Sequence, residues 1–254
     1  MLKFENISME YPSASGGILA LKDINLEIAK GEFVSILGPS GCGKSTLLFI
    51  ATGLTRPTQG KVSIDGKEVN KPIHEVGFVF QDHLLLEWRS AIENIALQGE
   101  LRDMDKKQCL QRSQELVELV GLNGFEDKYP YELSGGMQQR ISICRALLHY
   151  PEIIMMDEPF GALDALTREQ MRIDLEKLWL NLKSTVMLVT HDISEAILLS
   201  DRVIVVSPRP GTIHSEIGID LPRPRRLHIA ESAEFLDYKK QLTTIFMDMG
   251  ILRE

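Results

Sequence analysis

The spacing of apolar residues along the chain predicts different elements in successive zones. Up to about residue 79, short apolar or alternating runs at 24–28, 33–37 and 61–64 are separated by Gly and Pro, a pattern typical of strands and hairpins. From about residue 81 to 150, apolar residues recur at helical spacing, as at 92, 95 and 96, and strand-like runs are scarce. We therefore expect a helical insertion after an N-terminal region of strands.

The zone that begins at Pro151 alternates between the two patterns. Apolar runs at 153–156, 185–189 and 203–206 are separated by helical segments at about 166–182 and 193–199. Strands that alternate with helices predict parallel βαβ units, whose ligand sites lie at the carboxyl ends of the strands. The tail is rich in Pro and Arg at 222–226 and becomes helix-like from about residue 233.

Composition narrows the class of protein without defining an activity. The 254 residues are 44% hydrophobic and 25% charged, with a net charge of −8, which is ordinary for a globular chain of one or two domains. The acidic balance disfavours nucleic-acid binding through bulk charge. No apolar run reaches the length of a membrane span, and the first residues lack the apolar core of a signal peptide, so we expect a soluble, intracellular protein. Three widely spaced cysteines predict neither a disulfide framework nor a cysteine-rich zinc site.

A glycine-rich motif indicates phosphate binding. The predicted strand 33–37 leads into Gly38–Thr46, which fits GxxxxGK[ST], and residues 47–51 continue as a helix. In such a loop the backbone N–H groups and the helix N-terminus converge on phosphate oxygens. Lys44 would add a positive charge at the β- and γ-phosphates, and Ser45 would offer a hydroxyl to Mg²⁺. The alternative is a Gly-rich turn with an exposed lysine, which the flanking strand and helix disfavour.

Two carboxylates follow the apolar run 153–156. A carboxylate at the end of a buried parallel strand is costly unless it serves a metal ion or a reaction. Asp157 suits the Mg²⁺ shell of a nucleotidase, and Glu158 suits a base that polarises water for attack on the γ-phosphate. A solvated turn before Pro159 is the alternative.

Two further polar residues follow predicted strands in the same way. His191 ends the run 185–190, and Gln81 follows the run 76–80. At carboxyl strand ends they would lie where a γ-phosphate is bound, His191 as a contact to the phosphate and Gln81 as a ligand of Mg²⁺ or water. A structural histidine and a surface glutamine are the alternatives.

The segment 133–140 places a serine and two glycines before another apolar helical run. Ser134, Gly135 and Gly136 would form a second phosphate-binding helix start. Considered alone, this segment is better explained as a simple helix N-cap at Ser134.

Together these motifs resemble the nucleotide-binding subunit of ATP-binding cassette (ABC) transporters, along nearly the whole chain. The matching motifs are Walker A at 38–46, the Q-loop Gln81, the signature at 133–138, Walker B at 153–157 with Glu158, the D-loop at 162–164 and the switch histidine His191. Tyr11 matches the aromatic residue that stacks on adenine, with an ordinary strand tyrosine as the alternative. Met137 replaces the commonest glutamine of the signature, and the neighbouring Gln138 keeps its polar character.

The resemblance implies an α/β fold and a set of site residues. We expect one ABC ATPase domain over 1–254 with a RecA-like P-loop NTPase core: a β subdomain and the start of the core in 1–80, an inserted helical subdomain in 81–150, the rest of the core in 151–207 and a tail in 208–254. Catalysis is assigned to Lys44, Glu158 and His191, and Mg²⁺ binding to Ser45, Gln81 and Asp157. ATP binding is assigned to Tyr11, Gly38, Pro39, Ser40, Gly41, Cys42, Gly43, Lys44, Ser45, Thr46 and Gln81.

The family's mechanism implies partners. Two such subunits pair head to tail around two ATP molecules, so Ser134, Gly135, Gly136, Gln138 and Asp164 would act across the dimer. The apolar segment 84–88 would meet two membrane-spanning permease chains, or else is ordinary core. We expect an ATPase at the cytoplasmic face of the inner membrane, energised by ATP with Mg²⁺, served indirectly by a solute-binding protein and binding no nucleic acid.

Two stretches resemble the nitrate, sulfonate and taurine import subfamily. They are 157–168 and the Pro- and Arg-rich residues at 207–211 and 221–225, the latter with a solvated linker as the alternative. A small anion is therefore the expected cargo, although no residue of this chain should touch it. A non-transport ABC ATPase of the DNA-repair or translation-factor type is the alternative function, disfavoured by the short segment between Gln81 and Ser134 and by the single cassette.

Overall fold

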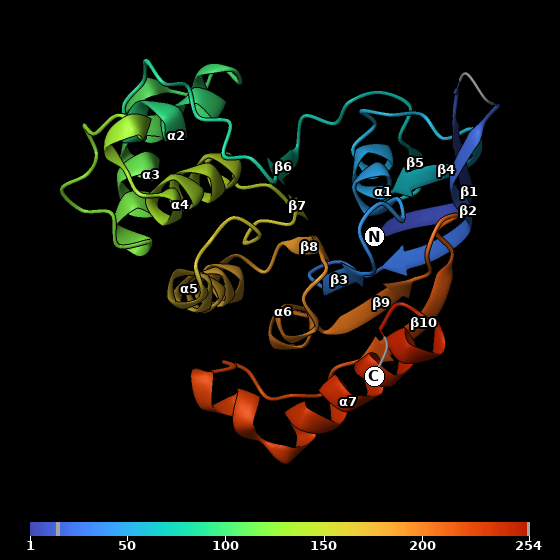
Figure 1. Ribbon diagram of the computed structural model, residues 1–254. Coiled ribbons are helices and arrows are strands. Elements are labelled where there is room, and N and C mark those ends of the chain that lie inside the picture. Colours follow the sequence, from blue (N-terminus) through green and yellow to red (C-terminus); the bar gives the residue numbers. More distant parts are fainter. Residues whose placement is uncertain (14–15, 253–254) are drawn as a thin grey trace. The chain divides into compact units, whose positions relative to one another are not determined.

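The computed structural model describes residues 1–13 and 16–252 and divides into two compact units (Figure 1). The first unit combines Met1–His74 with Thr185–Glu254, and the second is the continuous stretch Glu75–Ser184. Within the described residues, no helix has both the length and the apolar character needed to cross a membrane.

An antiparallel sheet in the first unit has the strand order β2-β1-β4-β5. Its strands are β1 (Leu2–Tyr11), β2 (Ile18–Ile28), β4 (Gln59–Ile64) and β5 (Lys67–Glu68). Side chains that alternate along β1 and β2, such as Phe4 and Ile24, are fully or almost fully buried. This alternation is the half-buried pattern expected of antiparallel strands, and it confirms the strands predicted for the N-terminal region.

A second group of strands in the first unit carries the phosphate loop. These are β3 (Phe33–Leu37), β8 (Thr185–Thr190), β9 (Arg202–Val206) and β10 (Ile213–Gly218). Strand β3 pairs in parallel with both β8 and β9, and β10 runs antiparallel to β9. All residues of β3 and β8 are buried, as expected of parallel strands whose sequences are mostly apolar.

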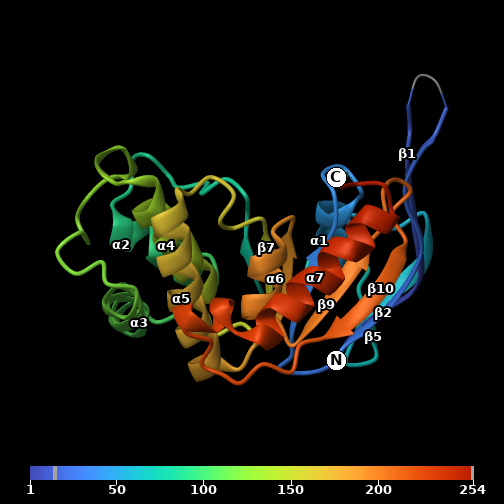
Figure 2. The same ribbon diagram turned by 60° about the horizontal axis from the view of Figure 1, so that its bottom comes forward.

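Three helices accompany these strands, α1 (Lys44–Ala51), α6 (Ile193–Leu199) and α7 (Ala233–Asp248), with a short 3-10 turn, Leu227–Glu231, before α7. Helices α6 and α7 contact each other (Figure 2). Phe235, Leu242 and Phe246 of α7 enter the same buried cluster as Ile197 of α6. The C-terminal tail is therefore part of the core of the first unit, and Arg225, only 5% exposed, excludes a solvated linker for the Pro- and Arg-rich run.

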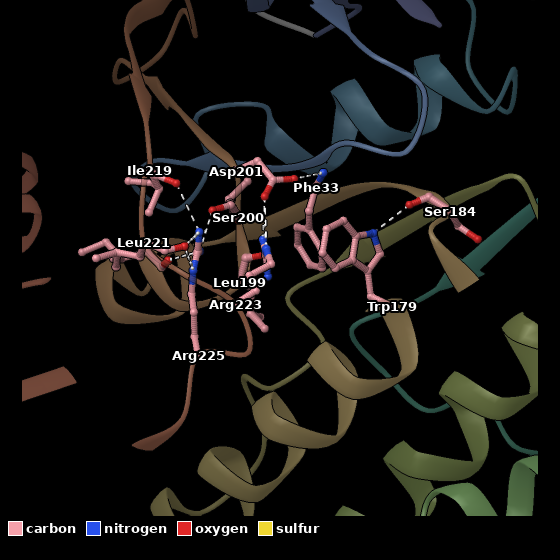
Figure 3. A network of polar contacts seen from close by, with 12 residues as sticks. Phe33, Trp179, Ser184, Leu199, Ser200, Asp201, Ile219, Leu221, Arg223 and Arg225 are labelled. Carbon is pink, nitrogen blue, oxygen red and sulfur yellow. Dashed lines mark hydrogen bonds and ion pairs between the residues drawn. The ribbon is translucent and has the colours of Figure 1, made fainter. Parts of the chain in front are cut away.

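In the second unit, β6 (Val76–Val79) pairs in parallel with β7 (Ile153–Asp157). The helices are α2 (Ala91–Glu100), α3 (Lys106–Leu119), α4 (Gly135–Leu147) and α5 (Ala165–Leu182), with a 3-10 turn at Pro130–Glu132. Helices α2, α3 and α4 contact one another, which confirms the helical insertion. At the end of α5, the indole of Trp179 donates to the carbonyl of Ser184 (Figure 3). The Ser184 hydroxyl donates in turn to the carbonyl of Pro151.

The limits of the helices follow ordinary capping chemistry. Ser90 and Glu93 form a capping box at the start of α2, and the Asp105 carboxylate accepts from the first amides of α3. The boundaries of the two units fall at 74/75 and 184/185, because β6, β7 and α5 cluster with the helices. The finer division of the chain at residues 80, 150 and 207 stays a prediction.

Candidate functional site

The phosphate loop, residues 38–46, connects the buried strand β3 to helix α1. Gly41 and Gly43 have φ values of 74° and 102°, a region that side chains other than glycine rarely adopt. A Cβ atom at Gly43 would also lie 2.7 Å from Leu21 Cδ2. The glycines of the motif are therefore required by backbone conformation and by packing against β2.

Lys44 is held inside this loop. Its ammonium donates to the carbonyl oxygens of Gly38 and Pro39 at 3.0 and 2.9 Å, and the residue is only 5% exposed. The alternative of a turn with an exposed lysine is therefore wrong. A positive charge inside a curl of backbone N–H groups at a helix N-terminus is the arrangement that binds phosphate.

A segment after β9 packs against the same loop. The Arg209 guanidinium donates to the carbonyl oxygen of Gly41 at 3.2 and 3.3 Å. A Cβ atom at Gly211 would overlap the carbonyl oxygen of Cys42. Neither residue was predicted to belong to the site. The signal in the sequence is the Pro- and Gly-rich turn at 207–211, directly after an apolar strand.

Tyr11 lies at the end of β1. Its hydroxyl is 3.2 Å from the hydroxyl of Thr46, the last residue of the loop motif. The structure therefore brings Tyr11 to the loop, as required if its ring is to contact a nucleotide bound there.

His191 leaves the strand next to β3. The parallel register pairs Leu37 with Thr190, so Gly38 and His191 follow directly from paired residues. The phosphate loop and the exposed His191 therefore begin at neighbouring carboxyl ends of two paired strands.

Hydrogen bonds fix the turn on both sides of His191. The Thr190 hydroxyl donates to the buried Glu195 carboxylate at 2.6 Å and accepts from the Asp192 amide at 3.0 Å. The Asp192 side chain in turn accepts from the Glu195 amide at 2.8 Å and caps α6. The role of Glu195 was not predicted, because in the sequence it is one of several polar residues in a predicted helix.

In the second unit, Gln81 and the acidic pair also follow neighbouring strands. Val79 of β6 pairs with Met156 of β7, so Gln81 and Asp157 lie near adjacent carboxyl ends. Asp157 is 6% exposed, whereas Gln81 is exposed. Glu158 adopts a left-handed backbone conformation with φ of 44°, which costs a non-glycine residue about 1–2 kcal/mol.

The signature lies at the start of α4. The Ser134 hydroxyl accepts from the Met137 amide at 3.4 Å, so Ser134 is the N-cap. The Gln138 side chain donates to the carbonyl of Pro130 at 2.8 Å, which fixes the preceding turn. Next to Ser134, nothing lies within 4 Å of a Cβ atom placed at Gly135.

Asp164 occupies the corresponding position at the start of α5. Its carboxylate accepts from the Thr167 amide at 3.1 Å, and hydrogen bonds from Thr167 lower the pKa of Asp164. A Cβ atom at Gly136 would overlap the Thr167 side chain. The signature and the D-loop residue are thus linked within this unit.

Helix α4 also holds the segment after Gln81. The Arg145 guanidinium donates to the carbonyls of His83 and Leu84 at 2.7 Å each. The Gln139 side chain is 2.6 Å from the His83 ring. These contacts were not predicted, because their partners lie about 60 residues away in the chain, and those of Arg145 are backbone carbonyls.

The structure gathers the predicted residues within each unit. In the first unit, the loop 38–46 and His191 follow the paired strands β3 and β8, and Tyr11 reaches the loop from β1 of the antiparallel sheet. The second holds Gln81, Asp157 and Glu158 at strand ends, and the signature and Asp164 at helix starts. Among the described residues, no group of three or more His, Cys, Asp and Glu side chains could hold a metal ion.

Comparison with known proteins identifies the class. The family described as ABC transporter matches residues 21–161. An uncharacterized ABC transporter ATP-binding protein of Methanocaldococcus jannaschii is 47% identical, covering 97% of this chain and 91% of the relative. An aliphatic sulfonates import ATP-binding protein of Bacillus cereus is 42% identical, with 99% and 98% covered. A taurine import ATP-binding protein of Jannaschia is 41% identical, with 98% and 94% covered.

A solved structure confirms the fold class. The dimeric ATP-binding cassette in a post-hydrolysis state bound to ADP and Pi superimposes with a TM-score of 0.77 at 37% identity, covering 87% of this chain and all of that one. The chain belongs to the ABC transporter family. It binds ATP and is an ATPase coupled to transport, so the alternative of a non-transport ABC ATPase is not favoured.

Proposed function

We propose that this chain is the ATP-hydrolysing subunit of an importer for a small anion such as nitrate, a sulfonate or taurine. The assignment as an ATPase is supported mainly by the register of β3 and β8. In this register the phosphate loop and His191 each follow directly from paired residues. The cargo assignment is supported by relatives named for sulfonate and taurine import at 41–42% identity over nearly the full chain.

On the first unit, ATP binds with its phosphates on Gly38, Pro39, Ser40, Gly41, Cys42, Gly43, Lys44, Ser45 and Thr46. The Lys44 ammonium, already directed into the loop, offsets the charge of the β- and γ-phosphates. The Tyr11 ring stacks on the adenine, and His191 contacts the γ-phosphate.

The residues assigned to Mg²⁺ fit that ion chemically. Ser45, Gln81 and Asp157 offer a hydroxyl, an amide oxygen and a carboxylate, which are the hard oxygen donors that Mg²⁺ prefers. These residues would hold Mg²⁺ that is bound with ATP, and the ion would supply neutralisation of charge on the phosphate oxygens. Glu158 polarises the water that attacks the γ-phosphate and accepts its proton at a carboxylate oxygen.

Two copies pair head to tail, so that each nucleotide is completed in trans. Backbone amides at Gly135 and Gly136, the Ser134 hydroxyl and the side chains of Gln138 and Asp164 contact the nucleotide or loop of the partner copy. The dimeric state of the similar cassette supports this arrangement. ATP then holds the dimer closed and hydrolysis releases it.

The dimer works on two permease subunits at the cytoplasmic face of the inner membrane, as a peripheral protein served indirectly by a solute-binding protein. The exposed side chains of Leu84, Trp88 and Tyr131 in the second unit, 55%, 73% and 73% exposed, provide apolar surface for the permeases. Nucleic acid is not a partner.

The ATPase proposal is tested with Glu158→Gln. This variant keeps ATP binding, loses steady-state hydrolysis by at least about a hundredfold, and dimerises with ATP in light scattering. Glu152→Gln, which changes an exposed glutamate six residues earlier in the chain, is the matched control. Normal turnover in Glu158→Gln refutes the assigned base, and a monomer at saturating ATP refutes the closed dimer.

The cargo proposal needs a separate experiment. The chain is co-purified with its membrane partners and reconstituted with the associated solute-binding protein. ATP-dependent uptake is measured for taurine, an alkanesulfonate and nitrate, with an amino acid and a sugar as controls. Uptake of the controls alone would overturn the small-anion assignment while leaving the ATPase intact.

A further inference from the structure

A buried arginine that follows β10, Arg225, lies against the C-terminal end of helix α6. Arg225 is 5% exposed, and its guanidinium donates hydrogen bonds to four backbone carbonyls (Figure 3). The shortest, both 2.7 Å, are to Ile197 and Ser200, and the others, at 3.2–3.3 Å, are to Ile219 and Leu221. A single side chain thus joins the end of α6 to the segment that follows β10.

Arg223 binds the same helix end beside it. Its guanidinium donates to the carbonyl of Leu199 at 2.7 Å and pairs with the Asp201 carboxylate at 2.8 Å (Figure 3). The second oxygen of that carboxylate accepts from the amide of Phe33 at 2.9 Å, at the start of the strand that leads to the phosphate loop. The tail is therefore hydrogen-bonded both to α6 and, through Asp201, to β3.

Three of the carbonyls that these arginines contact, those of Ile197, Leu199 and Ser200, lie at the C-terminal end of α6. The last four carbonyls of an α-helix have no intrahelical donor, and cations near that end interact favourably with the helix dipole. Helix α6 has only seven residues, and a helix this short has little stability of its own. Its order therefore depends on these caps and on its packing against α7.

The opposite end of α6 carries the turn of His191. Glu195, on the first turn of the helix, accepts the Thr190 hydroxyl at 2.6 Å, and Asp192 caps the helix at its start. His191 lies between Thr190 and Asp192, so its backbone follows the position of this end. One turn of helix separates Glu195 from the carbonyl of Leu199, which Arg223 contacts.

We propose that Arg223 and Arg225 are positioning residues for His191, because they fix the C-terminal end of the helix whose N-terminal end holds this histidine. The inference rests on the proposed role of His191 in hydrolysis. The tail would then set the turnover rate of a site that it does not touch.

Arginine suits this task better than an apolar side chain or lysine. A buried charge is costly and is not required for stability, because apolar packing would fill the same space at lower cost. The planar guanidinium, however, presents donors in a fixed fork that can hold several carbonyls in one relative position. Lysine carries the same charge without that geometry, so Arg225→Lys separates charge from positioning.

The test is a double-mutant cycle on steady-state ATP hydrolysis by the full chain. Arg225→Lys and Arg223→Met are each made alone and together with His191→Ala, and Arg226→Met, an exposed neighbour, is the matched control. We expect each single change in the arginines to lower kcat about tenfold with KM for ATP within about twofold of wild type. In the His191→Ala background the same changes should have almost no further effect on kcat.

The outcomes separate this inference from the proposed function. Equal losses with and without His191 would show a purely structural brace and overturn the inference alone. An unchanged kcat in His191→Ala would overturn the role of His191 and, with it, the inference. If Arg225→Lys does not fold, Arg223→Met decides, because its side chain is 14% exposed and its loss leaves the Arg225 contacts in place. An effect of Arg226→Met as large as theirs would also contradict the proposal.

Discussion

The hydroxyl of Tyr11 lies 3.2 Å from the hydroxyl of Thr46, which joins the end of β1 to the first turn of the helix after the phosphate loop. The two residues are 35 positions apart, and this contact brings an aromatic ring to the loop from a different sheet. The hydrogen bond orients the ring, and the ring itself is the part that would contact adenine.

Replacing Tyr11 separates these two roles. Tyr11→Phe keeps the ring and should bind ATP with nearly the wild-type Kd. Tyr11→Ala removes the stacking surface, which is worth about 1–3 kcal/mol per base, and should weaken binding by about tenfold or more. Titration calorimetry with ATP and with triphosphate lacking the base checks the result. Equal affinities for Tyr11→Ala and the wild type would show that the tyrosine is an ordinary strand residue.

Removing the Lys44 ammonium should abolish stabilisation by nucleotide. A ligand at a hundred times its Kd raises the free energy of unfolding by about 2.7 kcal/mol, and Lys44→Ala should show almost none of this gain at the same ATP concentration. Thermal unfolding with and without ATP measures it. Lys61→Ala, whose side chain is 56% exposed, is the control and should respond to ATP as the wild type does. An ATP-induced shift in Tm of Lys44→Ala that matches the control would contradict phosphate binding by the ammonium.

A methyl group at Gly211 should disturb the phosphate loop from outside. Its Cβ would overlap the carbonyl oxygen of Cys42, a backbone atom that can move only with the loop. Gly211→Ala should therefore weaken ATP binding and lower Tm, with a cost in the range of about 1–3 kcal/mol for an overpacked site. Gly218→Ala is the matched control, because nothing lies within 4 Å of the added atom. Wild-type ATP affinity in Gly211→Ala would show that the 207–211 turn does not shape the loop.

The second unit should lose stability in mild acid because of His149. Burial, with help from the charge of Arg102, lowers the pKa of His149 to about 4 from an ordinary value of 6.5. Between these two values the unfolded chain binds a proton that the folded chain does not, so the free energy of unfolding falls as the pH drops from about 6.5 towards 4. Above that window the group has no effect.

This pH dependence is measured as Tm at pH 7.5 and pH 5. His149→Gln should show a smaller drop in Tm than the wild type, since glutamine does not titrate. His214→Gln, which changes an exposed histidine, should keep the wild-type drop. The same drop in His149→Gln and in the wild type would contradict the assigned pKa.

Much of the fold could be predicted because its signals are local. The strands at 33–37, 153–157 and 185–190 are mostly apolar, with polar residues only at Ser35, Asp157, Thr185 and Thr190, and a buried parallel strand favours that pattern. The phosphate loop was predictable for the same reason, since its glycines, Lys44 and flanking elements are contiguous in the sequence. The β3–β8 register places His191 directly after a strand end next to the phosphate loop, as the sequence pattern predicted.

The contacts that were not predicted depend on partners far apart in the sequence. Arg225 is indistinguishable in the sequence from the exposed Arg226, and only folding brings the carbonyls of Ile197 and Ser200 to it. The Arg145 contacts with the His83 and Leu84 carbonyls are invisible for the same reason. Backbone carbonyls occur at every residue, so composition and periodicity carry no information about which of them an arginine will meet.

The left-handed backbone at Glu158, with φ of 44°, has a consequence for the history of this chain. Glycine or asparagine would occupy that position with less strain. Random substitution without selection for activity would therefore favour a more stable protein that lacks the Glu158 carboxylate. A survey of stabilised variants of this chain should therefore recover changes at residue 158 among the most thermostable and the least active. A glutamate retained at position 158 would then indicate selection for ATP turnover, because stability alone favours another residue there.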